Sequence, residues 1–277
     1  LPGAVLQIAV ATALGMALAH FWGWSIGGGL VFGLALSVAS TVVLLRALEE
    51  RRLTETPRGK IAVGWLIVED LAMVLVLVLL PVFAEAQRGQ SAGVGALLGA
   101  VALTLGQVAV FVALMLVVGR RVIPKMLERV ALSGSKELFT LTVLSIALGV
   151  AFGSAALFGV SFALGAFFAG MVLNESELSH EAAQDTLPLR DAFAVLFFVS
   201  VGMLFDPSIV LREPLQVLAT LGIIVVGKSI AALLIVRAFG HAMTTAATIA
   251  ASLAQIGEFS FILVTMGTDL QLLPAAA

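Results

Sequence analysis

The sequence of 277 residues contains no cysteine, and only 12% of its residues are charged. Without cysteine the chain can form neither disulfide bonds nor thiolate-metal sites. It also has no long basic tract, so nothing in it indicates nucleic-acid binding. Soluble domains carry about 25% charged residues. A share of 12% therefore argues against a soluble protein.

What the sequence has in abundance is apolar residues. They make up 61% of the chain, and the mean hydropathy is +1.14. Soluble domains are about 45–50% apolar, and a large core does not explain the difference. No stretch alternates between apolar and polar residues as outer-membrane strands do, so the pattern favours a helical bundle over a barrel. We conclude that the chain is an all-α polytopic membrane protein.

The apolar stretches predict the number of spans, because a crossing helix needs about 20 mostly apolar residues. Nine candidates are found, at residues 2–22, 26–48, 60–84, 93–118, 137–155, 158–174, 189–205, 214–238 and 245–267. The fifth and sixth candidates are short, and one re-entrant unit is an alternative to two spans.

The basic residues predict the orientation. If the first span runs outward, 12 of the 15 lysines and arginines fall in four inner segments, 46–60, 119–136, 175–191 and 237–244. Arg88 and Arg212 fall in outer segments, and Lys228 lies within a span. This bias follows the positive-inside rule, and the acidic character of 175–191 does not oppose it because acidic residues contribute little to orientation.

Four ionisable residues remain at membrane depth: Glu69, Asp70, Lys228 and Glu258. A charge in the bilayer centre costs a few kcal/mol, so such side chains face a cavity or a partner. Adjacent residues of a helix point about 100° apart, so Glu69 and Asp70 have different surroundings. We expect Lys228 to pair with Glu69 or to steady a helix crossing, although a purely structural salt bridge remains open.

Two acids and one base leave one carboxylate without a partner. A buried carboxylate in that position binds a cation or a proton, which predicts ion binding at Asp70. Glu258 lies in the middle of its span, where a structural role and a functional role are both open.

Two spans contain small and polar residues near their centres. The candidates are Ser37, Ser40 and Thr41 in the second span, and Ser252, Gln255, Gly257, Glu258 and Ser260 in the ninth. Interrupted helices of transporters expose backbone groups near the midplane, whereas ordinary packing through small residues is the alternative. Each of these spans follows an uninterrupted one, and five spans separate the two pairs. An odd number reverses direction, as an inverted repeat requires.

Several segments resemble the cation:proton antiporter-2 superfamily, in particular its Kef-type and YbaL-like potassium/proton antiporters. They occur in the family order across nearly the whole chain: "GLALSVASTVVLLRALEERRLTETPRGK", "LIVEDLAMVLVLVLLP", "GAFFAGMVLNESE", "LFFVSVGMLFDP", "VVGKSIAALLIV" and "QIGEFSFIL".

The resemblance implies a sodium/proton-antiporter-like fold of about thirteen spans with inverted repeats and two crossing discontinuous helices. Residues 1–277 would be a fragment of the transmembrane exchanger domain, with its fourth to twelfth spans, and the protein a homodimer. A cytoplasmic nucleotide-binding domain would lie outside this chain, so we expect no cofactor within it.

The resemblance also places the family's functional residues. The ion-binding aspartate falls on Asp70, the core lysine on Lys228, and the crossing helices on Ser40–Thr41 and Gln255–Ser260. Glu69 departs from the Gln-Asp pattern that well-studied Kef antiporters resemble, and Glu-Asp is typical of the YbaL-like branch. This departure leaves the cation and the stoichiometry open.

We therefore expect a transporter of the bacterial inner membrane, and not an enzyme, that exchanges potassium or sodium for protons. Asp70 would bind the ion, Glu69 would hold a second proton or pair with Lys228, and Thr41 and Ser40 would complete the oxygen shell, since hard cations prefer oxygen ligands. Open alternatives are a sodium-coupled organic-anion symporter, a potassium efflux system that is silent without its partner, and a structural subunit. An intramembrane aspartyl protease would need two facing aspartates, and Asp70 alone lies at depth.

Overall fold

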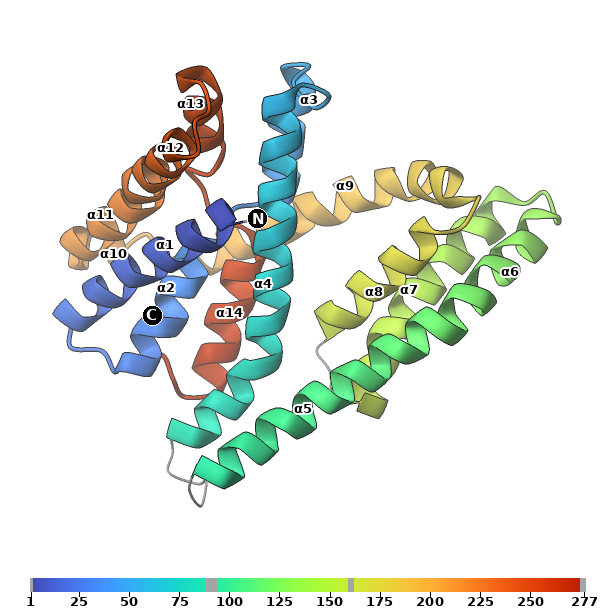
Figure 1. Cartoon of the computed structure of the whole chain (residues 1–277), viewed down its shortest axis with the longest axis horizontal. Coiled ribbons are helices and arrows are strands. Elements are labelled where there is room, and N and C mark those ends of the chain that lie inside the picture. Colours follow the sequence, from blue (N-terminus) through green and yellow to red (C-terminus); the bar gives the residue numbers. More distant parts are fainter. Residues whose placement is uncertain (1, 88–93, 159–161, 275–277) are drawn as a thin grey trace. The chain divides into compact units, whose positions relative to one another are not determined.

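A computed structural model of the chain describes residues 2–87, 94–158 and 162–274. In these ranges helices are the only regular secondary structure (Figure 1). The chain divides into two compact units. The first combines Leu1–Gln90 with Asp206–Ala277, and the second is Ser91–Phe205.

The first unit contains the residues at membrane depth. Its helices are α1 (Pro2–Phe21), α2 (Ile26–Ser37), α3 (Thr41–Glu50), α4 (Pro57–Gln87), α10 (Ile209–Arg212), α11 (Pro214–Gly222), the π-helical turn η2 (Ile223–Gly227), α12 (Lys228–Ala238), α13 (Met243–Ser252) and α14 (Glu258–Asp269). The core of this unit consists of small and branched apolar side chains of α1, α3, α4, α12 and α13. Alanines at positions 4, 62, 232 and 246 let these helices approach closely.

Two of the predicted spans are interrupted, as the polar residues at their centres indicated. The second span breaks at 38–40, where Val38 and Ser40 have extended backbone conformations. Ser40 then caps α3, since its hydroxyl accepts a hydrogen bond from the Val43 N–H at 3.4 Å. The ninth span breaks between the end of α13 and Gly257, which precedes the first residue of α14.

Helices α1 and α2 cross at two glycines. A Cβ atom on Gly15 would lie 2.4 Å from the Gly33 Cα atom, and one on Gly33 would lie 2.3 Å from the Thr12 carbonyl oxygen. Both distances are too short for any side chain larger than hydrogen. The small residues therefore bring the two backbones together and hold the uninterrupted first span against the interrupted second one.

The second unit contains α5 (Val94–Leu114), the π-helical turn η1 (Met115–Gly119), α6 (Arg120–Ala131), α7 (Lys136–Phe158), α8 (Phe162–Asn174) and α9 (Ser179–Leu204). Phe111 packs against Phe158 and Phe168, with ring centroids 5.7 and 5.6 Å apart. An ion pair joins Arg120 at the start of α6 to Glu175 just after α8. These contacts connect α5, α6, α7 and α8 within the unit.

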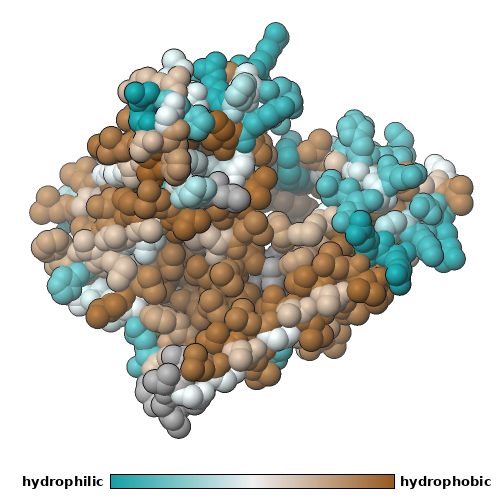
Figure 2. Space-filling model, in the orientation of Figure 1, coloured by the Kyte–Doolittle hydropathy of each residue, from teal (hydrophilic) through white to brown (hydrophobic). Residues whose placement is uncertain are grey.

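The described parts of all nine predicted spans are largely helical. Within the described residues, seven stretches are long and apolar enough to cross a membrane, and the interrupted second span, Ile26–Glu50, is one of them. The other two predicted spans are α8, with 13 residues, and the ninth span with its break. Whether α7 and α8 form one re-entrant unit depends partly on 159–161, which lie outside the described residues. Figure 2 shows apolar side chains over the helical surfaces and polar ones gathered at the end of the first unit that carries α3.

Two inner segments that lie outside the predicted spans are largely helical. Helix α9 begins at Ser179, ten residues before the predicted span, and α6 extends to Ala131 within the segment 119–136. The sequences "HEAAQ" and "RRVIPKMLERVA" are rich in good helix formers. Hydropathy marks only the apolar part of a helix. The predicted boundaries therefore left out the polar ends of α6 and α9.

The close approach of α1 and α2 predicts that Gly33→Val destabilises the protein. Overpacking at a tight contact costs about 1–3 kcal/mol, which lowers the melting temperature by several degrees. The measurement is thermal unfolding of the purified full-length protein in detergent. Gly222→Val in α11 is the control, because a Cβ atom there has no neighbour within 4 Å. Equal melting temperatures for the two variants would contradict the close crossing.

Candidate functional site

The candidate site lies where the two helix breaks meet. Gln255, in the second break, binds the backbone of Ser40 in the first through two hydrogen bonds. Its Oε1 accepts from the Ser40 N–H at 3.0 Å, and its Nε2 donates to the Ser40 carbonyl at 3.1 Å. A Cβ atom on Gly257 would lie 2.8 Å from the Ala39 carbonyl oxygen, so only glycine allows this approach. One amide side chain thus satisfies both backbone groups of Ser40.

Lys228 links the two breaks from α12. Its Nζ donates to the Val38 carbonyl at 3.1 Å and to the Gln255 carbonyl at 2.8 Å. Both acceptors follow the C-terminal ends of helices, α2 and α13, where the helix dipole favours a positive charge. The side chain is fully buried. An ammonium group in this position satisfies carbonyl oxygens that the broken helices leave open.

The predicted ion pair between Lys228 and Glu69 is not formed at contact distance. Among the ion pairs within 4 Å in the described ranges, none contains either side chain. Glu69 Oε2 instead accepts a hydrogen bond from the Ala39 N–H at 2.9 Å, in the first break. Of the two expected roles of Lys228, the geometry matches the steadying of the crossing. The two charges still attract each other across the break.

Asp70 lies beside the same break, on another face of α4. Its Oδ2 accepts a hydrogen bond from the Thr41 hydroxyl at 3.1 Å. Its Oδ1 is buried and has no hydrogen-bond partner among the described residues. The residue as a whole is only partly buried, unlike Glu69, which is fully buried. Asp70 therefore has one oxygen atom without a hydrogen-bond partner, on a side chain that is only partly buried.

Residues of α14 complete the crossing. Glu258, the first residue of this helix, is partly exposed and interacts electrostatically with Asp70. Ser260 donates to the Ala35 carbonyl of α2 at 2.5 Å and so binds the two interrupted spans together. Each break thus presents one helix N-terminus with an acidic residue nearby, an arrangement that the helix dipole stabilises.

All the sequence-predicted site residues belong to this crossing, but their contacts differ from those we expected. The Ser40 hydroxyl caps α3 and its backbone binds Gln255, so Ser40 shapes the break. The Val38 carbonyl was missed, because backbone acceptors have no signature in residue types. Trp65, one helical turn before Glu69, was also missed. A tryptophan within an apolar span next to a buried acid is the signal that could have revealed it.

In the ranges 2–87, 94–158 and 162–274, no group of three or more histidine, cysteine or acidic side chains is arranged to hold a metal ion. The crossing offers one carboxylate oxygen without a hydrogen-bond partner and one hydroxyl group. Oxygen ligands of this kind suit hard cations.

Comparisons with known proteins agree with this architecture. The family described as "Sodium/hydrogen exchanger, transmembrane" matches residues 1–277. YbaL of Escherichia coli, named provisionally as a cation/proton antiporter, is 66% identical over 276 residues, which cover 100% of this chain and 50% of that protein.

Two further relatives are more distant. K(+) efflux antiporter 4 of Arabidopsis thaliana is 33% identical over 99% of this chain and 45% of its own length. The glutathione-regulated potassium-efflux system protein KefC of Salmonella typhi is 32% identical over 94% of this chain and 41% of its own length. The chain thus spans about half the length of these relatives or less.

The apolar helices and the bacterial relatives place the chain in the inner membrane as a multi-pass protein. The chain has two interrupted helices, a lysine that links them and carboxylates beside them. Its whole length matches one family. The chain belongs to the sodium/hydrogen exchanger family of membrane proteins.

Proposed function

We propose that the protein exchanges a monovalent cation for protons across the inner membrane by competition at Asp70. The observation that carries this proposal is the Asp70 carboxylate at the crossing, with one oxygen held by Thr41 and the other buried without a partner. A carboxylate in such a place needs a cation or a proton. Because it cannot hold both, occupancy by one excludes the other and couples the two fluxes.

Thr41 is the second ligand that we propose. Its hydroxyl donates to Asp70 Oδ2, which leaves its own lone pairs free to face a cation. Backbone carbonyls of the breaks would complete the oxygen shell. Glu258 interacts with Asp70 and adds negative charge to the site, so it would strengthen cation attraction without lying in the same hydrogen-bond network.

Potassium is the cation that we favour over sodium. The support comes from relatives whose names contain potassium: K(+) efflux antiporter 4 and the KefC protein. Selectivity depends on cavity size and on the number of coordinating dipoles, which residue types do not reveal. Sodium therefore remains in the test below.

A sodium-coupled organic-anion symporter is the competing function, and the geometry disfavours it. Such a protein needs a positive group for its anion, and Lys228 is the single base that the sequence places at depth. Its ammonium group is fully buried and donates to two backbone carbonyls. Binding an anion there would remove the hydrogen bonds that join the two breaks.

We assign residues 1–277 to the transmembrane exchanger domain of a longer protein. We expect its remaining spans and a nucleotide-binding regulatory domain outside residues 1–277, and we expect the protein to be a homodimer. The name of the KefC relative contains a regulator, glutathione. The full-length protein is therefore the material for every transport experiment proposed here.

The first prediction of this proposal is that Asp70→Asn abolishes exchange. In vesicles that contain the full-length protein, potassium or sodium should drive proton movement in the wild type and leave the variant at the rate of protein-free vesicles. The reason is that an amide neither binds the proton nor balances the cation. Asp269→Asn, an exposed residue at the end of α14, is the matched control and should retain wild-type rates. A wild-type rate of exchange in Asp70→Asn would contradict the proposal.

The second prediction concerns pH. Because a proton and a cation compete for one carboxylate, the apparent KM for the cation should rise by about tenfold for each unit of pH lowered in the acid range. A hundredfold rise in the apparent KM for each unit of pH would indicate that a second carboxylate takes part. The measurement is the initial rate of exchange over a series of cation concentrations at several symmetrical pH values. An apparent KM that does not depend on pH contradicts competition.

The third prediction is that Lys228→Met destabilises the protein. The substitution removes the donor from two buried carbonyl groups, at a cost of about 1–3 kcal/mol for each unsatisfied group. Lys228→Gln keeps an N–H donor and should recover part of the loss. Thermal unfolding measures the effect, with the exposed Lys136→Met as the control. Unchanged stability with lost exchange would mean that Lys228 serves transport alone and not the crossing.

A further inference from the structure

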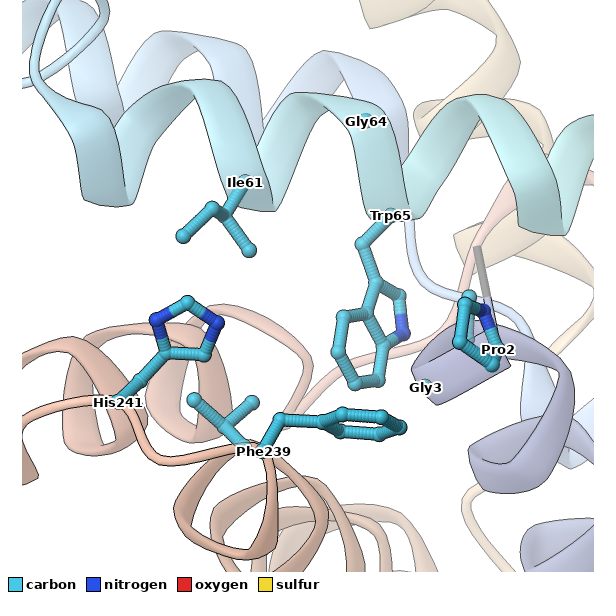
Figure 3. Close-up of a pocket in the computed structure, with 9 residues that line it drawn as sticks. Pro2, Gly3, Ile61, Gly64, Trp65, Phe239 and His241 are labelled. Carbon is cyan, nitrogen blue, oxygen red and sulfur yellow. The ribbon is translucent and has the colours of Figure 1, made fainter.

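A pocket in the first unit lies on the same face of α4 as Glu69. Its volume is about 460 Å³, and its lining includes Ile61, Gly64 and Trp65 from α4, opposite Val236, Phe239 and His241. In Figure 3, Ile61 and Trp65 point from α4 toward Phe239 and His241. In a helix, residues 61, 65 and 69 follow one another at intervals of one turn, so this face leads from the pocket to Glu69.

The pocket opens at the cytoplasmic end of the unit. Arg58 and Lys60 lie at the start of α4, and Arg237 lies in the last turn of α12. These residues belong to the inner segments defined by the positive-inside bias. His241 lines the pocket and is exposed.

Two unsatisfied polar atoms lie on this face of α4, one on the lining residue Trp65 and the other on Glu69, which lies behind Trp65 and is not part of the lining. Trp65 Nε1 and Glu69 Oε1 are both buried, and neither has a hydrogen-bond partner among the described residues. One is a donor and the other is an acceptor, and they lie one turn apart on α4. The indole N–H is close enough to interact with the carboxylate, although the pair does not have hydrogen-bond geometry. Buried polar atoms without partners are rare, and a bound water that bridges them is the usual explanation.

Apolar side chains close the space around these two atoms. Ala4 and Val236 are buried, and Trp65 is only 7% exposed. Glu69 is therefore separated from the pocket by little more than the indole ring. The distance along the helix from Trp65 to Glu69 is about 6 Å.

The charged groups around Glu69 are few. Lys228 from α12 and Asp70 from α4 interact with it electrostatically. Helix α13 carries no ionisable residue, and in α14 Glu258 interacts with Asp70. In α1 the one ionisable residue is His20, in the last turn, away from the pocket at Pro2. The charged residues of α3 are Arg46, Glu49 and Glu50, all exposed.

We propose that this pocket is the cytoplasmic entrance of a proton route that ends at Glu69 and is separate from the access of ions to Asp70. The Trp65 indole and one bridging water form its inner end. A proton arriving through water binds Glu69 Oε1, the oxygen without a partner, while Oε2 continues to accept from the Ala39 N–H. The inference rests on the proposed exchange function, because it gives Glu69 its own proton source.

The chain offers a direct test of the entrance, because its 277 residues contain no cysteine. Gly64→Cys places a thiol in the pocket, and a Cβ atom at Gly64 has no neighbour within 4 Å. A membrane-impermeant methanethiosulfonate reagent should label it from the cytoplasmic side of oriented vesicles and not from the other side. Ile67→Cys, on the exposed surface of the same helix, is the control that should resist the reagent from both sides.

The connection to Glu69 is tested by infrared spectroscopy of the full-length protein at acid pH. The carboxylic acid bands of Glu69 and Asp70 are assigned by their loss in Glu69→Gln and Asp70→Asn. Labelling Gly64→Cys should slow hydrogen–deuterium exchange of the Glu69 band several-fold and leave the Asp70 band unchanged. Trp65→Ala, which removes the covering ring, should accelerate exchange of the Glu69 band alone. Trp65→Leu, which also removes the ring, replaces it if that variant does not fold.

Two outcomes would overturn the inference: equal slowing of both bands, or no slowing of either after complete labelling. Neither readout requires transport. A protein that moves no cation but shows selective slowing of the Glu69 band would disprove the exchange function and leave the route intact. Normal cation/proton exchange together with equal slowing of the two bands would support the exchange function and overturn the proton route.

Discussion

The structure of the first unit depends on satisfying the backbone groups that two broken helices expose inside a membrane. No water is available in the bilayer core to bind free N–H and C=O groups. Gln255 satisfies Ser40, Lys228 satisfies the carbonyls of Val38 and Gln255, and Glu69 satisfies the Ala39 N–H. The basic group lies at carbonyls and the acidic groups lie near helix N-termini, so each charge also matches the local dipole. Burying polar side chains at membrane depth costs free energy, but here these side chains satisfy the backbone groups of the breaks and so make the breaks possible.

The same constraint separates the two adjacent acids. Glu69 is fully buried and uses one oxygen to hold the first break, whereas Asp70 is partly exposed and is held by a side chain, Thr41. The 100° between neighbouring helical positions gives them different neighbours although they are consecutive in sequence. A substitution of one acid therefore disturbs the backbone of the break, and a substitution of the other disturbs an open ligand position.

The sequence allowed most of the fold to be predicted, because nine apolar stretches and two polar interruptions have strong signatures. Glu69, Asp70, Lys228 and Gln255 could be predicted as site residues because ionisable and amide groups are rare at membrane depth. Their pairings could not. Lys228 follows the π-helical turn η2, which changes the helical register, and its acceptors are backbone carbonyls that any residue supplies. The helical extensions of α6 and α9 were missed because polar helices lack an apolar boundary.

Close packing gives the crossing its rigidity, and this bears on how the two acids are reached. Gly257 lies against Ala39, Ser260 binds Ala35, and Gly15 meets Gly33, so small displacements within this core would create overlaps. In the proposed proton route, access to the buried Glu69 does not come from loosening of the crossing itself. It uses a space beside the crossing, the pocket next to Trp65 on the Glu69 face of α4. A rigid crossing with a separate space beside it would keep the proposed ion ligands in place while a proton reaches the second acid.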